Sequence, residues 1–263
     1  MPLKLKTSAN GHELSLATGF FYQYNERSFL ITNYHVVAGI NPNTGTILHS
    51  GGAVPDTITL GVASKENNAA GTAMVRWRWR QLSLYSGDNR EPIWTEHPTY
   101  GRRFDVVAIP LAGLEETSIR AANSSELQLD PIRLYPSMEA FVIGYPRGMS
   151  GGGNFPIWKR ATIATEPDLD LDDLPRFYID TATREGMSGS PVYAQEVGYW
   201  LPEGVTDPSE ACIGKGRRFV GVYSGRLGAE DEFKAQLGIV WKESGLISLI
   251  ESVSSDSKRP SES

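Results

Sequence analysis

The sequence contains very little cysteine, since Cys212 is the only one in 263 residues. A single thiol cannot form an intramolecular disulfide, so packing and hydrogen bonds must hold the fold together. Cys212 has no second cysteine or histidine at metal-ligand spacing, and we interpret it as neither a nucleophile nor a metal ligand. The absence of disulfides favours a reducing compartment, and we expect a cytoplasmic protein.

Long apolar runs and an excess of positive charge are also lacking. Residues 1–8 contain two lysines with no apolar stretch after them, so we expect neither a signal peptide nor a transmembrane span. The formal net charge of −6 disfavours nucleic acid or an anionic membrane as the main partner.

Two biased segments lack the residues that would make them ligand sites. Residues 151–153 are three glycines without the Gly-Lys-Ser/Thr of a phosphate-binding loop, and they predict a flexible loop. The acidic residues between positions 166 and 173 lack the glycine and the terminal glutamate of an EF-hand calcium loop. We therefore expect a solvated acidic loop, no metal and no cofactor.

The composition favours a β-rich fold. The chain combines 27 glycines and 16 prolines with short β-branched runs, and its 40% hydrophobic content suffices for a sizeable core. Residues 75–80 alternate arginine with apolar side chains, which predicts an amphipathic strand rather than a partner-binding or nucleic-acid patch. Strands are expected over residues 20–22 and 28–32, which would form a hairpin around residues 25–27. Further strands are expected over 57–62, 106–111, 141–144, 177–180, 219–223 and 237–241, and a helix over 245–251.

Three motifs, in this order, point to acyl-transfer chemistry. They are Thr-Asn-Tyr-His-Val-Val at 32–37, Phe-Asp-Val-Val-Ala-Ile at 104–109 and Gly-Met-Ser-Gly-Ser-Pro at 186–191. A serine hydroxyl is a weak nucleophile that needs a base, and that base needs a third group to fix its tautomer. We predict that Ser188 is the nucleophile, His35 the general base and Asp105 the group that orients the imidazole.

Each of the three has a structural alternative: a hydrogen-bonded structural histidine, a strand-capping aspartate and a glycine-rich turn. Asp56 and Asp88 are alternative candidates for the aspartate that orients the imidazole, but neither directly precedes a predicted buried strand. The other histidines lack the motif and are expected on the surface or in loops: His12, His49 and His97.

The glycines around Ser188 predict an oxyanion hole. Without side chains, the turn can aim backbone N–H groups at the developing negative charge. The expected donors are the N–H groups of Gly186 and Ser188. The chain order His, Asp, Ser differs from that of the α/β-hydrolases and of the subtilisin-like enzymes.

These motifs resemble those of trypsin-like (chymotrypsin-fold) serine peptidases of the bacterial kind. Further matching segments lie at 18–22, 144–146 and 221–225, so the resemblance runs from about residue 17 to residue 240. The Gly-Ser-Pro ending after the serine resembles glutamyl-endopeptidase-like members.

The resemblance implies an all-β fold of two six-stranded antiparallel β-barrels followed by a helix, all in one peptidase domain over residues 1–251. The expected parts are an N-terminal barrel at about 10–122, a linker at 123–136, a C-terminal barrel at about 137–242, a helix at 243–251 and a disordered tail at 252–263.

Two departures from the family pattern bear on activation and on size. Met187 stands where digestive trypsins carry the aspartate that a newly cut N-terminus neutralises, so we expect no activation by N-terminal cleavage. Control by a regulatory protein partner, or by movement of residues 147–156, stays open. The segment between His35 and Asp105 is longer than in simple members, which suggests an inserted hairpin.

The resemblance also implies a primary specificity pocket next to the nucleophile turn and a late strand. Its residues here are Ala182, Thr183, Tyr223, Ser224, Gly225 and Arg226. The backbone of residues 223–225 would pair with an extended substrate. Glu185, at the rim, is the only acidic residue in these segments, so a preference for Lys or Arg is not expected.

Two substrate preferences stay open. Thr183 together with Arg184 or Arg226 would favour a glutamate side chain in the pocket. Tyr223, however, replaces the family's usual late-strand histidine, and a pocket for a small or apolar side chain is the alternative.

The sequence therefore predicts a serine endopeptidase that acts on protein or peptide substrates. The alternative is a catalytically silent binding module that keeps the peptidase fold; the intact set of three motifs favours the enzyme. Ester hydrolysis by the same residues is a third, minor hypothesis.

Overall fold

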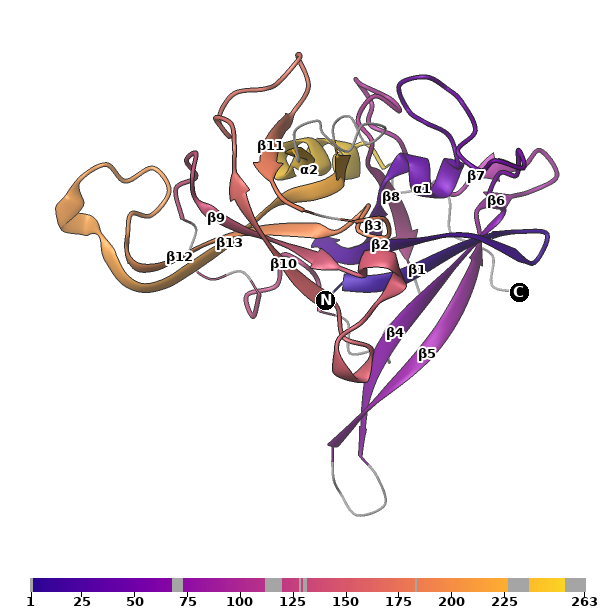
Figure 1. Ribbon diagram of the computed structural model, residues 1–263, viewed down its shortest axis with the longest axis horizontal. Coiled ribbons are helices and arrows are strands. Elements are labelled where there is room, and N and C mark those ends of the chain that lie inside the picture. Colours follow the sequence, from indigo (N-terminus) through magenta and orange to yellow (C-terminus); the bar gives the residue numbers. More distant parts are fainter. Residues whose placement is uncertain are drawn as a thin grey trace.

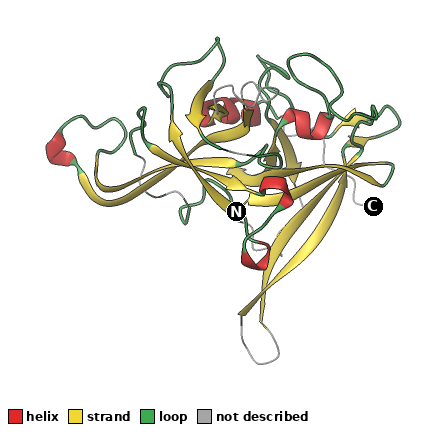
Figure 2. Ribbon diagram, viewed as in Figure 1, coloured by secondary structure: helices red, strands yellow, loops and turns green. Residues whose placement is uncertain are grey.

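Two six-stranded antiparallel sheets make up most of the chain (Figures 1 and 2). The computed structural model describes residues 2–67, 73–111, 120–127, 129, 132–182, 184–226 and 237–253. The first sheet consists of β1 (Pro2–Ala9), β2 (His12–Tyr24), β3 (Arg27–Thr32), β4 (Thr57–Asn67), β5 (Ala73–Ser83) and β8 (Val107–Leu111). Its strand order is β5-β4-β1-β2-β3-β8.

The second sheet closes into a barrel with the order β10-β11-β14-β13-β12-β9. Its strands are β9 (Glu139–Gly144), β10 (Ile157–Ile163), β11 (Arg176–Asp180), β12 (Pro191–Trp200), β13 (Cys212–Arg226) and β14 (Leu237–Lys242). The helix α2 (Glu243–Glu251) follows directly. The expected all-β fold class is confirmed: two six-stranded antiparallel sheets, of which the second is a closed barrel, are followed by a C-terminal helix.

The remaining elements are short. They are the helix α1 (Tyr34–Ala38), the strands β6 (Tyr85–Ser86) and β7 (Glu91–Pro92), and the 3₁₀ turns η1 (Pro146–Gly148), η2 (Gly152–Asn154) and η3 (Pro208–Glu210). Within the described part of the chain no helix has the length and apolar character needed to cross a membrane.

Three clusters of buried apolar side chains hold the two sheets and α2 together. One fills the first sheet, one fills the barrel, and the third lies between them. In the third cluster the ring of Phe104, which precedes β8, meets Trp241 of β14 at 4.9 Å between centroids. Leu246 of α2 is fully buried in the same cluster. The junction between the two sheets is therefore a packed core that fixes their relative position.

The hairpin between β2 and β3 forms where the sequence predicts it. Asn25 and Glu26 both have positive φ, +46° and +61°. A two-residue turn with two left-handed residues matches the twist of the paired strands. β3 then leads through Asn33 into α1, which ends at Gly39 in the left-handed conformation (φ +64°).

Strand β1 lies before the expected start of the first barrel near residue 10. Leu3 and Leu5 are buried in the apolar cluster of the first sheet, while Lys4 and Lys6 are only half-buried. This alternation of apolar and charged residues is a strand pattern. This strand is not among those predicted from the sequence.

The β4–β5 hairpin is a long ribbon that projects from the body of the molecule (Figure 1). Pairing between β4 and β1 stops at Leu60, so beyond this point β4 is paired with β5 alone. The prediction of a strand over residues 75–80 is confirmed, but its apolar face is only partly covered. Val75 is 44% exposed and Trp79 is 50% exposed, whereas Trp77 between them packs on Gly153 and Phe155.

The end of the chain is described only as far as Val253, which is buried against the cluster that contains α2. The predicted disordered tail, residues 252–263, otherwise lies outside the described residues. The predicted domain limits stay predictions.

Candidate active site

His35 and Asp105 are brought together by the pairing of β3 with β8. Thr32 at the end of β3 lies opposite Val107 at the start of β8. His35 follows β3 in the first turn of α1, and Asp105 stands just before β8. The imidazole Nδ1 of His35 lies 2.7 Å from Oδ2 of Asp105, and the backbone N–H of His35 donates to Oδ1 at 2.9 Å.

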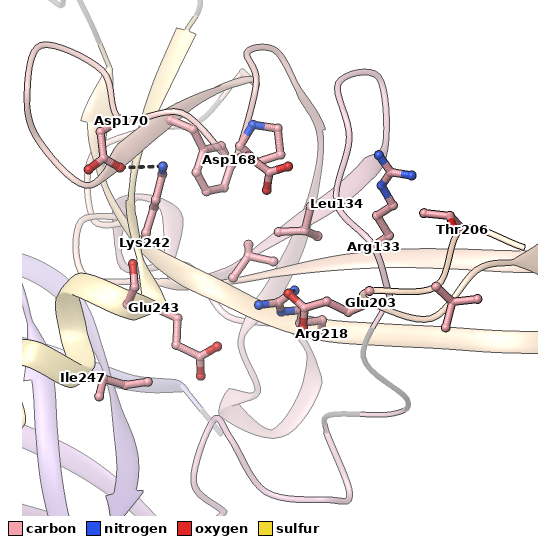
Figure 3. A pocket seen from close by; sticks show the side chains of 16 residues that line it. Arg133, Leu134, Asp168, Asp170, Glu203, Thr206, Arg218, Lys242, Glu243 and Ile247 are labelled. Atoms are coloured by element: carbon pink, nitrogen blue, oxygen red, sulfur yellow. Dashed lines mark hydrogen bonds and ion pairs between the residues drawn. The ribbon is translucent and has the colours of Figure 1, made fainter.

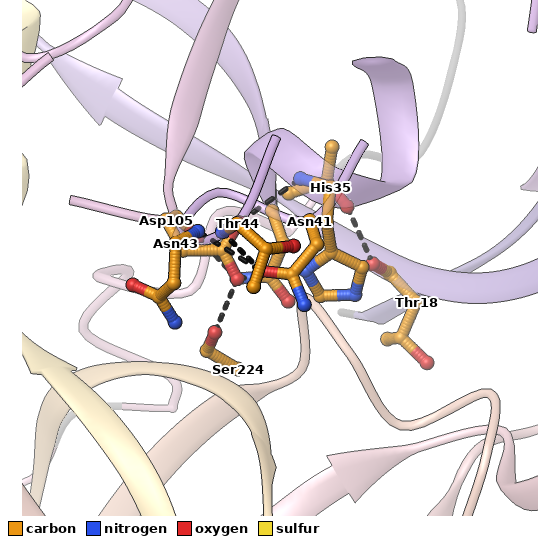
Figure 4. A network of polar contacts seen from close by, with 9 residues as sticks. Thr18, His35, Asn41, Asn43, Thr44, Asp105 and Ser224 are labelled. Atoms are coloured by element: carbon orange, nitrogen blue, oxygen red, sulfur yellow. Dashed lines mark hydrogen bonds and ion pairs between the residues drawn. The ribbon is translucent and has the colours of Figure 1, made fainter. Parts of the chain in front are cut away.

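Two further side chains fix Asp105. The Ser224 hydroxyl, from β13 of the barrel, donates to Oδ2 of Asp105 (Figure 4). The Asn33 amide Nδ2 donates to the backbone carbonyl of Asp105 at 2.6 Å, and Asn33 is fully buried. The Asp105 side chain is 5% exposed, against 20% for His35. A carboxylate with three donors in a buried position can hold the imidazole in one orientation.

Sequence reasoning did not assign these two contacts. The sequence predicts that Ser224 presents its backbone to a substrate. It assigns Asn33 no contact of its own beyond its place in the motif around His35. Neither contact has a signal in the local sequence, because Ser224 and Asp105 are 119 residues apart.

The charge state of His35 follows from this environment. Burial by itself lowers the pKa of the imidazole, but the negative charge and the hydrogen bond of Asp105 raise it more. The pKa of His35 is therefore raised above its ordinary value of 6.5.

The turn that carries Ser188 lies between β11 and β12 and depends on two glycines. Gly186 and Gly189 have φ of +87° and +81°. A Cβ at Gly186 would lie 2.4 Å from the carbonyl oxygen of Tyr145, and one at Gly189 would lie 2.1 Å from that of Thr18. Both the backbone conformation and the close approach of neighbouring backbone require glycine here.

The backbone carbonyls of Glu185 and Gly186, at the start of this turn, are hydrogen-bonded to other segments of the chain. The Glu185 carbonyl accepts a hydrogen bond from the Arg147 N–H at 2.6 Å. The Gly186 carbonyl accepts one from the Thr18 hydroxyl at 2.8 Å. In the described part of the chain the N–H groups of Gly186 and Ser188 have no hydrogen-bond partner. Two such donors two residues apart can bind an oxyanion.

Ser188 and His35 border the same cavity, which has a volume of ≈ 710 Å³. Among the described residues the Ser188 hydroxyl makes no hydrogen bond, and catalytic hydrogen bonds often close only when substrate binds. The cavity is also lined by Glu13, Leu14, Leu16, Arg147 and Glu185. The structure thus gathers the predicted His35, Asp105, Ser188 and Gly186 at the junction of the two sheets.

Comparison with known proteins decides the family. Residues 17–199 match the family described as the trypsin-like peptidase domain. The chain belongs to the trypsin-like peptidases. No curated protein sequence matches it significantly.

Solved structures of low sequence identity are similar to this trypsin-like peptidase. A thermostable serine protease from an extremophilic microorganism is 12% identical, with 97% of each chain covered and a TM-score of 0.50. The inactive form of the Rv3671c protease is 17% identical, with 97% of this chain and 89% of that chain covered and a TM-score of 0.44. Human heparin binding protein is 14% identical, with 99% and 94% covered and a TM-score of 0.45.

Only some of the expected specificity residues of the trypsin-like peptidase can be located relative to the turn that carries Ser188. Ala182 is exposed after β11. Thr183 and the side chain of Arg226 lie outside the described residues. Tyr223 is buried, and its N–H and carbonyl already bond to Ser190 and Gly189, each at 2.9 Å.

The prediction that the Tyr223 backbone pairs with a substrate is therefore wrong, because both of its groups are used inside the fold. The backbones of Ser224 and Gly225 are not used in this way. The register between β13 and β14 shifts between Tyr223 and Arg226, so in the described chain Ser224 and Gly225 have no partner in β14. They stay candidates for pairing with a peptide.

His97 lies in a loop, between β7 and β8, as one of the two expectations had it, but it is not on the surface. It is 5% exposed, and its Nδ1 accepts hydrogen bonds from the N–H groups of Thr99 and Tyr100. Its ring packs on Tyr100 and Phe104, and burial lowers the pKa of His97. His97 is thus a buried structural histidine rather than a surface one.

A second cavity, of ≈ 680 Å³, is lined by the acidic loop, β13 and the start of α2 (Figure 3). It contains none of the predicted catalytic residues. Lys242 pairs with Asp170 at 2.7 Å, and Arg218 pairs with Glu203 at 2.6 Å. Part of the acidic run is therefore neutralised by cations of the same chain.

Proposed function

We propose that this trypsin-like peptidase is a serine endopeptidase that works through an acyl-enzyme intermediate. The observation that carries the proposal is the His35–Asp105 contact at 2.7 Å beside a cavity shared by His35, Ser188 and Gly186. Acyl transfer requires an oriented imidazole beside a serine hydroxyl that faces the same cavity and unpaired backbone N–H groups.

In the proposed reaction the Ser188 oxygen attacks the substrate carbonyl carbon, and its proton passes to Nε2 of His35. The carbonyl π pair moves to oxygen, and the N–H groups of Gly186 and Ser188 stabilise this oxyanion. When the carbonyl reforms, the C–N bond breaks and His35 gives its proton to the leaving amine. Water then repeats the sequence on the acyl ester and releases Ser188.

We also propose that the turn is competent without cleavage of the N-terminus. Met187 is fully buried in the apolar cluster of the barrel. A methionine carries no charge, so no incoming ammonium group is needed to neutralise it. Glycine at 186 and 189 and the bonds to Thr18 and Arg147 support the turn instead.

The activity should fall at low pH with an inflection above pH 6.5. His35 must be neutral to accept the Ser188 proton, and its pKa is raised above 6.5. Below that pKa, kcat/KM should decrease about tenfold per pH unit. The imidazole resonances of the Ser188→Ala protein, followed by NMR, should show His35 titrating above 6.5 and the buried His97 below it. A His35 pKa below 6.5 would contradict the assignment.

Peptides that differ only in the residue before the scissile bond test the function and its preference together. Glu13 and the rim residue Glu185 line the cavity beside Ser188, but the expected specificity residues that the structure describes add no carboxylate. Cleavage after Lys or Arg should therefore be at least roughly tenfold slower than cleavage after the preferred residue, since a buried unpaired charge is costly.

Mass spectrometry of the products identifies the cleaved bonds, and the Ser188→Ala protein is the control. Fastest cleavage after Glu would support the arginine hypothesis of Arg184 and Arg226 and the glutamyl-endopeptidase subtype. Fastest cleavage after Ala or Leu would support the small or apolar pocket. Fastest cleavage after Lys or Arg would refute the predicted exclusion of basic residues.

A further inference from the structure

One segment connects the nucleophile turn with the projecting β4–β5 ribbon. Residues 147–155 begin at the cavity that contains Ser188 and run past β1, where Lys4 Nζ donates to the Gly148 carbonyl at 2.5 Å. The same residues then reach β5 of the ribbon, where Gly153 of η2 accepts a hydrogen bond from Trp77.

At the ribbon the segment is fastened to Trp77 of β5. The indole N–H of Trp77 donates to the Gly153 carbonyl at 2.8 Å. Its ring meets Phe155 edge-on, with centroids 6.0 Å apart and planes at 76°. Trp77 thus joins the ribbon to this segment.

The backbone of the segment needs such support. Arg147 and Asn154 adopt left-handed conformations, with φ of +50° and +62°. Non-glycine residues populate this region sparsely, so contacts with the rest of the molecule must hold it. The fastening at Trp77 supplies contacts at the far end, and the bond from Arg147 to Glu185 supplies one at the near end.

The near end acts on the oxyanion hole through one peptide unit. The Glu185 carbonyl, which accepts from the Arg147 N–H at 2.6 Å, belongs to the same peptide plane as the N–H of Gly186. In a planar trans peptide the C=O and N–H point in opposite directions. Fixing the carbonyl on Arg147 therefore fixes the direction of the Gly186 N–H, on the side where Gly186 borders the cavity.

We propose that Trp77 is a positioning residue for the oxyanion hole. It anchors residues 147–155 on β5, and the anchored Arg147 N–H keeps the Glu185–Gly186 peptide in the orientation that offers the Gly186 N–H to the oxyanion. This inference rests on the proposed peptidase function. It assigns to the ribbon a part in catalysis although the ribbon holds no residue that touches the reacting atoms.

The decisive comparison is between Trp77→Ala and Trp79→Ala. Trp79 lies two positions along the same strand, is 50% exposed and has its indole over Gly61. Trp77→Ala should lower kcat by about tenfold to a hundredfold, less than the loss of a whole oxyanion donor. KM should change less than about twofold, because the interaction is made in the transition state. Trp79→Ala should leave both constants within about twofold of the wild type.

Trp77→Phe keeps an aromatic ring against Phe155 but loses the hydrogen bond, and its kcat should lie between those of the wild type and Trp77→Ala. This conservative variant also covers the case in which Trp77→Ala does not fold.

Amide hydrogen exchange supplies a readout that needs no turnover. In the Ser188→Ala background, removal of Trp77 should speed exchange at Arg147 and Gly148 and leave β2 and β3 unchanged. Equal kcat in the two alanine variants, an effect on KM alone, or unchanged exchange at Arg147 would overturn the inference. If the wild type hydrolyses no peptide, the proposed function fails, and the exchange result still decides whether Trp77 anchors the segment.

Discussion

Replacing Ser188 by alanine is expected to reduce kcat by about 10⁶-fold while leaving the fold intact, and His35→Ala should do the same. Each variant removes one end of the proton transfer, and the remaining group cannot compensate. Ser188 is half-buried in a turn whose shape is set by Gly186 and Gly189, so the loss of one hydroxyl does not disturb packing. Initial rates on a peptide substrate, with circular dichroism as a check of folding, measure the effect.

Ser190→Ala is the matched control in the same turn. The Ser190 hydroxyl is buried and has no hydrogen-bond partner in the described structure. Its removal should leave kcat/KM within about threefold of the wild type, because an unpaired buried polar atom contributes nothing favourable. Loss of activity in Ser190→Ala with retention in Ser188→Ala would reverse the assignment of the nucleophile.

Asp105→Asn is expected to cost about 10⁴-fold in kcat. An asparagine can place its NH₂ group against Nδ1 of His35, which then holds the tautomer that cannot accept the serine proton at Nε2. The charge that raises the pKa of His35 is lost as well. The pH dependence of kcat, measured on the purified variant, should shift its inflection to lower pH.

Ser224→Ala provides the graded comparison. It removes one hydrogen bond to Asp105 but leaves both contacts of the carboxylate with His35 in place. The loss should be on the order of tenfold, as expected for one hydrogen bond to a charged group.

For the Asp105→Asn variant, a reduction in kcat of less than about a hundredfold would show that the carboxylate does not orient the imidazole.

The sequence predicted the parts of this site that are written in short local patterns. The turn around Ser188, the strand after Asp105 and the hairpin at Asn25 and Glu26 depend on neighbours in the chain, and their glycines and apolar runs are visible in the sequence. The order of the three motifs then indicated a known arrangement. The fold class followed from the same resemblance.

What the sequence could not show are contacts between distant segments. Ser224 meets Asp105 from the other sheet, and Arg147 meets Glu185 through the backbone, which no side-chain pattern reports. The burial of the Tyr223 and His97 side chains likewise depends on tertiary neighbours. The alternation in residues 75–80 predicted a strand correctly, but an alternating pattern cannot tell a covered apolar face from an exposed one.

The central claim, that Ser188 is an activated nucleophile in the chain as it stands, is tested most directly by a fluorophosphonate probe. Protein that retains Met1 is treated with the probe, and the modified peptide is identified by mass spectrometry. We expect one equivalent of phosphonate on Ser188, and none on folded Ser188→Ala protein. A folded wild-type protein that takes up no probe, or takes it up only after cleavage of its N-terminus, would contradict the claim and favour the catalytically silent binding module or activation by processing.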